Sequence, residues 1–127
     1  MIEGYFIEGA VAVGAAGSAT VTTTSKQPIV GRVLAVGVNF RGTAAAATTD
    51  VTVRTANLNQ GMPKVTLLAL VNATADVWRQ VYVLVDDVAG TDIAATYTQV
   101  VIADYVEVLL AQGDADQIVD VLLVVER

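Results

Sequence analysis

Short apolar segments separated by turn-forming residues recur along the whole chain. Within these segments β-branched residues are frequent, and apolar and polar positions often alternate, which is typical of β-strands. By contrast, the sequence does not keep the 3.6-residue period of an amphipathic helix over a length that would sustain one. Strands are therefore predicted over residues 2–7, 19–24, 29–40, 50–55, 64–72, 78–86, 104–112 and 117–126.

The number and spacing of these segments favour one architecture. About eight short strands, with a turn signal roughly every ten residues, are typical of an antiparallel β-sandwich. We predict an all-β, jelly-roll-like sandwich over residues 29–127 and an N-terminal extended segment or arm over residues 1–28, together forming a single compact domain. The segment Ile2–Ile7 has two interpretations: an arm that orders on a partner, or the first strand of the domain's own sheet.

The segment 117–126, QIVDVLLVVE, is apolar on both of its faces. Successive side chains of a strand point to opposite faces, so Val121 and Leu123 share one face while Leu122 and Val124 share the other. In a two-sheet sandwich only the inner face of each sheet is buried. We therefore predict that the side chains of the second apolar face are covered and not left in water. Another subunit is one interpretation, and strand coiling or loops of the same chain is the alternative.

Composition and charge exclude several classes of function. The chain is 54% hydrophobic and 16% charged, with a net charge of −6, which argues against binding to nucleic acid or to anionic membranes. Histidine and cysteine are both absent, so disulfides, thiolate sites and the Ser-His-Asp and Cys-His catalytic arrangements are excluded. The start of the sequence lacks the basic and apolar regions of a signal peptide, which indicates synthesis in a cytoplasm. We expect no enzymatic activity, no cofactor and no metal.

Four motifs follow one another in a recognisable order. They are GRVLAVGVNF at 31–40, TTDVTVRT at 48–55, VTLLALVNATADVWRQVYVLVDDVAG at 65–90 and DYVEVLLAQGDADQIVDVLLVVE at 104–126. In this order the chain resembles small structural proteins of tailed bacteriophages. The similarity covers about three quarters of the sequence, and its most specific part is AQGDA before the final valine-rich strand.

The resemblance implies a virion component, namely a capsid decoration or cement protein that binds the outer head surface and stabilises it. It also implies the major capsid protein as a partner and a location on the capsid surface of the virion. We expect a homo-oligomer, and we favour a trimer over a dimer because local threefold positions recur on an icosahedral lattice. The expected subunit or capsid interface comprises Ile2, Tyr5, Phe6, Ile7, Leu68, Leu109, Leu122 and Val124.

Other functions stay open at this point. Trp78 and Tyr82 occupy alternate positions of one predicted strand and could stack on a sugar ring, as in a carbohydrate-binding module on a phage or bacterial surface. Two acidic groups, 86–92 and 114–120, offer oxygen ligands for Ca²⁺, although they lack the 12-residue loop pattern and acids are ordinary turn formers. A component of a bacterial shell is a further alternative.

Overall fold

The computed structural model describes residues 1–42, 45–58, 63–86 and 88–127, of which 83–86 are described as backbone only. The described residues form eleven strands and no helix. The strands are β1 (Ile2–Ile7), β2 (Ala19–Thr24), β3 (Ile29–Gly42), β4 (Asp50–Thr55), β5 (Thr66–Leu70), β6 (Val77–Gln80), β7 (Val83–Asp86), β8 (Asp92–Thr98), β9 (Val100–Asp104), β10 (Val106–Gly113) and β11 (Gln117–Glu126).

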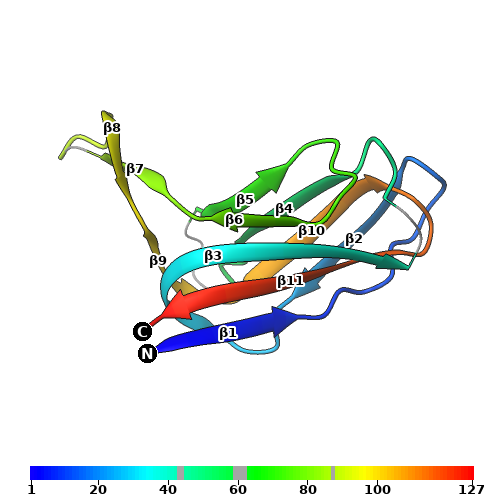
Figure 1. The fold of residues 1–127 in the computed structure, drawn as a ribbon, viewed down its shortest axis with the longest axis horizontal. Helices are drawn as coiled ribbons and strands as arrows, with labels where there is room; N and C mark the ends of the chain where they lie inside the picture. Colours follow the sequence, from blue (N-terminus) through cyan, green and yellow to red (C-terminus); the bar gives the residue numbers. More distant parts are fainter. Residues whose placement is uncertain (43–44, 59–62, 87) are drawn as a thin grey trace.

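Nine of these strands form two antiparallel sheets that enclose one core (Figure 1). The first sheet has the order β1-β11-β3-β6, with β9 also paired to β3, and the second has the order β2-β10-β4-β5. The first strand therefore pairs with the last, the second with the tenth, and the fourth with the fifth. This nested pairing is that of a jelly roll, so the predicted antiparallel sandwich is confirmed.

The core lies between the inner faces of the two sheets. The inward residues of β11 are at most 3% exposed, whereas Leu122 between them is 37% exposed. These inward residues are Val119, Val121, Leu123 and Val125. The predicted division of this strand into an inner and an outer face is therefore confirmed, and its second apolar face is only partly covered by the chain.

The N-terminal segment is part of the sandwich. β1 pairs with β11 along its whole length, and β2 pairs with β10. Of the two interpretations of Ile2–Ile7, the structure has the strand of the domain's own sheet and not a free arm. Residues before position 29 supply an edge strand to each sheet, so the boundary drawn there does not separate two parts.

The fourth strand of the first sheet is interrupted. β6 lies opposite residues 35–38 of β3, and β9 lies opposite residues 29–33 on the same edge. Between these two pieces the chain leaves the sheet as the hairpin β7-β8, which projects from the sandwich (Figure 1). We call this hairpin, residues 83–98, the arm, and it is distinct from the N-terminal segment. The single strand predicted over 78–86 was wrong, because this stretch is divided between β6 and the arm, and β8 and β9 were not predicted.

β-Bulges change which side chains face inward. The register of β3 against β11 shifts opposite Val124 and Val125. As a result Val33, which simple alternation places on the outer face with Gly37, is fully buried. The pairing of β4 with β5 also shifts, next to Val53. Beyond each shift of one residue, the side chains of that strand change from one face of the sheet to the other.

Candidate interaction surface

The outer face of the first sheet carries a row of apolar residues that crosses four strands. Phe6, Leu122, Gly37 and Trp78 lie directly opposite one another on β1, β11, β3 and β6. Residues paired in this way point to the same face of a sheet. Phe6 is 65% exposed and Trp78 is 56% exposed. We call these four residues the apolar row.

Gly37 allows the tryptophan to lie close to the sheet. A Cβ atom at this position would be 2.8 Å from Cε3 of the Trp78 ring. The absence of a side chain therefore lets the indole approach the backbone of β3 beside Leu122. A shallow groove of about 220 Å³ follows the apolar row from Phe6 to Trp78. The row is thus a continuous surface and not a set of isolated side chains.

A second row crosses the same face nearer the base of the arm. Ile2, Glu126, Arg32 and Val101 are paired in this order on β1, β11, β3 and β9. Glu126 is four residues from Leu122 on β11, so the two rows are about 13 Å apart along the strand. The outer face therefore has an aromatic region and a charged region.

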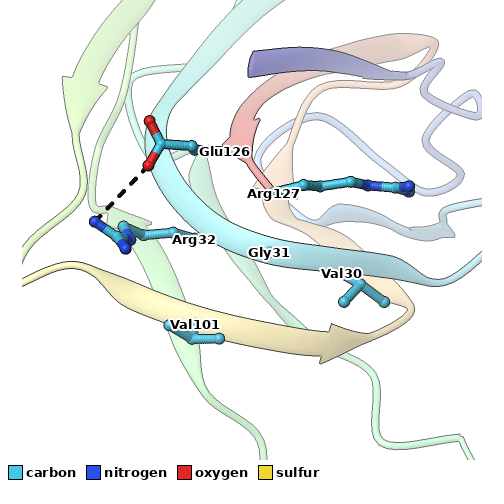
Figure 2. Close-up of a pocket in the computed structure, with 6 residues that line it drawn as sticks. All are labelled: Val30, Gly31, Arg32, Val101, Glu126 and Arg127. Carbon is cyan, nitrogen blue, oxygen red and sulfur yellow. Dashed lines mark ion pairs between the residues drawn. The ribbon is translucent and has the colours of Figure 1, made fainter. Parts of the chain in front are cut away.

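The charged region contains an open groove of about 600 Å³ (Figure 2). Its lining residues are Val30, Gly31, Arg32, Val101, Glu126 and Arg127. Arg32 pairs with Glu126 at 3.8 Å on the outer face, and this long, solvent-exposed ion pair contributes little to stability, so the Arg32 guanidinium can exchange partners at small cost. The Arg127 side chain points away from Arg32 (Figure 2), toward Glu3 at 3.6 Å and the Tyr5 hydroxyl at 2.7 Å. We call this site the arginine groove.

Asp120 fixes the other end of the face. Although it lies on the outer side of β11, it is only 4% exposed. Its carboxylate accepts hydrogen bonds from Nε and Nη2 of Arg41 and from the backbone amide of Gly9. The hydrogen bond from Arg41 to Asp120 raises the pKa of that guanidinium. This carboxylate therefore joins the end of β1 to β3 and β11.

The outer face of the second sheet has a different chemistry. Glu107 is buried and accepts hydrogen bonds from Arg54 and Lys64, both at 2.7 Å. Burial by itself raises the pKa of Glu107, but the hydrogen bonds from Lys64 and Arg54 outweigh it and hold the pKa below its ordinary value. Leu109 is half-buried on the same face, paired with Thr22 and Thr52. The cations of this face are thus satisfied within the chain.

The structure divides the eight expected interface residues among three environments. Four lie on the outer face of the first sheet. Of these, Ile2 is 62% exposed, Phe6 65% and Leu122 37%, and Val124 is half-buried. Leu109 lies on the outer face of the second sheet. The other three face the core: Ile7 is buried, and Tyr5 and Leu68 pack against the core cluster.

Two of those inward placements follow from strand pairing. The odd-numbered residues of β1 face the core because Tyr5 pairs with Leu123 and Ile7 with Val121, both of which point inward. Leu68 faces inward because it pairs with Val53. The interface role expected of Ile7 was therefore wrong, because this side chain is buried. Tyr5 and Leu68 are half-buried, and their interface role stays a prediction. Trp78 was not among the expected interface residues, because the sequence did not show that its strand pairs with β3.

The structure separates the two aromatic residues that suggested a sugar site. Trp78 lies in the apolar row, whereas β6 ends at Gln80 and Tyr82 lies beyond it. Tyr82 instead forms an apolar pocket of about 320 Å³ with Tyr97 of the arm. The expected platform of alternate residues on one strand is therefore not formed.

The acidic groups considered for calcium are not gathered into a site in the part of the chain that the structure describes. Asp120 is held by Arg41, and Asp116 lies in a turn with a positive φ of 64°. Asp87 and the side chain of Asp86 lie outside the described residues. The surface as a whole offers apolar contact and paired charges.

Comparisons with protein-family models and with curated proteins found no match to this chain. In the described residues, no helix has the length and apolar character needed to cross a membrane.

Proposed function

We propose that the protein is a structural, non-catalytic virion component, a capsid decoration or cement protein that binds the outer head surface of a tailed phage as a homo-oligomer. The observation that carries the proposal is the apolar row. Phe6, Leu122 and Trp78 form one exposed stripe across a sheet face. Such a stripe on a sandwich without a cover of its own favours docking to another protein.

The energetics support docking through this face. Burying a large apolar side chain completely contributes about 1.5–3 kcal/mol. Because Phe6 and Trp78 are a little more than half exposed, covering the remainder contributes about 1 kcal/mol for each. Many copies bound to a lattice add these modest contributions, which suits a protein that stabilises a shell without chemistry of its own.

The asymmetry of the two outer faces supports the same function. The first sheet presents apolar side chains, whereas the second presents threonines and a carboxylate that is satisfied by its own cations. A net charge of −6 discourages nonspecific association of the solvent-facing side. The jelly roll, which is frequent among viral capsid domains, and the resemblance to small phage structural proteins are consistent with this proposal.

Two leucines on opposite outer faces provide the test. Leu122→Asp places a carboxylate in the apolar row, and Leu109→Asp places one on the second sheet as a matched control. Binding to purified heads of the phage whose genome carries this sequence is measured by co-sedimentation. We expect wild type and Leu109→Asp to bind and Leu122→Asp to bind about 100-fold more weakly, because the interface would bury an unpaired charge. Equal binding by all three proteins would refute docking through the apolar row.

A second candidate is a carbohydrate-binding module, which the exposure of Trp78, Tyr82 and Tyr97 favours. Aromatic faces stack on sugar rings, and lectins also use jelly rolls. On this alternative, glycan-array binding is present in wild type and lost in Trp78→Ala or Tyr97→Ala. Absence of glycan binding in wild type, or binding that survives both substitutions, would count against it.

A further inference from the structure

The arm leaves the sandwich where the sheet does not require it. The amide of Val81 donates to the carbonyl of Leu34, and Val100 pairs with Val33. The two ends of the excursion therefore lie opposite adjacent residues of β3. A short turn between Val81 and Val100 would complete the fourth strand, so the arm serves a purpose other than closing the sandwich.

The second strand of the arm, β8, is exposed on both of its faces. All seven residues of β8 are exposed, including Ile93 at 41% and Tyr97 at 64%. β7 and β8 pair only with each other within the described residues. A two-stranded ribbon with both faces in water is marginally stable at best. The arm therefore indicates a partner that covers it.

The charges of the arm define the chemistry of that partner. Residues 83–98 contain three aspartates, Asp86, Asp87 and Asp92, and neither lysine nor arginine. Valine, isoleucine, leucine, alanine and tyrosine make up most of the remainder. A complementary surface combines guanidinium or ammonium groups with exposed aliphatic side chains.

The arginine groove has this combination. Arg32 supplies its guanidinium group, and Val30 and Val101, 50% and 73% exposed, form its apolar part (Figure 2). Its one acidic lining residue is Glu126. By contrast, Arg41 and Arg54 are engaged by the buried carboxylates Asp120 and Glu107.

The groove also adjoins an open sheet edge. β9 pairs with β3 alone in the part of the chain that is described. Its other edge presents unpaired backbone groups, to which a strand from another molecule can add. The arm of the same copy does not fill this place, because it projects away from the sandwich (Figure 1) and Val101 stays exposed.

We propose that the arm of one copy lies in the arginine groove of a second copy, along the open edge of β9. Asp92 meets Arg32, and the exposed Val88 and Ile93 of the arm cover Val30 and Val101. This inference rests on the homo-oligomeric part of the proposed function and names the contact that holds the copies together. An arm-to-groove contact joins different surfaces, so it closes into a ring of copies when the rotation allows.

The first test removes the arm. Residues 82–99 are replaced by a short glycine-serine turn that joins Val81 to Val100, and native mass is measured by light scattering across a hundredfold dilution. We expect wild type to form a defined oligomer and the armless protein to scatter as one chain, slightly below 13.2 kDa, with an unchanged β-type circular dichroism spectrum. An armless protein that keeps the oligomeric mass would overturn the proposal, as would a monomeric wild type.

The second test leaves the arm in place and reverses charges. Asp92→Arg alters only the arm and Arg32→Glu alters only the groove, and both sites are solvent-exposed, so folding is retained. Each variant alone should raise the dissociation constant about 100-fold. Combining Asp92→Arg and Arg32→Glu in one chain should restore assembly, because every contact in a ring of any order then pairs opposite charges in exchanged positions. Failure of the double variant to assemble, or assembly of each single variant at wild-type strength, would contradict the charge pairing.

The two proposals fail separately. A monomeric chain that still binds heads through Leu122 refutes the arm-to-groove contact and leaves head binding intact. If that monomer loses head binding when the arm is removed, the arm docks to the capsid and not to a second copy. An arm-dependent oligomer that does not bind heads supports the contact and refutes the capsid function.

Discussion

Leu122 and Leu123 offer a direct test of the two faces of β11. They are neighbours of the same residue type, but Leu123 is fully buried and Leu122 is 37% exposed. Truncating a buried leucine to alanine costs about 2–5 kcal/mol, because a cavity remains. For Leu122 about two thirds of the side chain is already covered, so its truncation costs about 1 kcal/mol in the isolated chain.

Urea unfolding measured at low protein concentration gives both values. A domain of this size has a free energy of unfolding of about 5–15 kcal/mol, so each variant should remain folded in water. The Leu122→Ala loss should not change with protein concentration, because the proposed contact between copies joins the arm to the arginine groove and does not involve Leu122. Equal losses for the two variants in dilute solution would mean that both faces are buried within one chain, and the argument for an outer interface would fail.

Two further changes probe other parts of the surface. Glu107→Gln removes the charge that Arg54 and Lys64 share, and should lower the free energy of unfolding by about 1–3 kcal/mol at neutral pH. Since the pKa of Glu107 is lowered in the folded chain, its contribution is complete above the ordinary value of 4.5 and is lost as pH falls through the folded pKa. Urea midpoints of wild type and Glu107→Gln should therefore converge in acid, and a constant difference would be the contrary result. Gly37→Ala should displace the Trp78 ring and shift its fluorescence while changing stability by less than about 1 kcal/mol, and an unchanged emission spectrum would show that the indole does not lie over β3.

The sequence predicted most strands and the inner face of β11, because a period of two and turn residues are local properties. It did not predict which neighbours each strand acquires. The inward positions of Tyr5 and Leu68 depend on pairing with β11 and β4, and a bulge turns Val33 inward.

The residues of the candidate interaction surface could also be predicted only in part from the sequence. Leu122 could be placed on an outer face from alternation alone, whereas the outward position of Phe6 follows from the pairing of β1 with β11. Their alignment with Trp78 arises from the register of four strands that are distant in sequence. The arginine groove was missed for the same reason, since Arg32 and Glu126 are brought together only by the pairing of β3 with β11.

The pairing of β1 with β11 has a consequence for how the protein folds. Residues 2–7 are synthesised early, but their partners, 121–126, emerge from the ribosome more than a hundred residues later. A topology dominated by such distant contacts folds slowly, on a scale of about milliseconds to seconds. Until β11 docks, the first sheet has no continuous connection between β1 and β3, and the edge of each strand that pairs with β11 stays accessible. Nascent chains are therefore exposed to association with one another before they can form the ordered assembly.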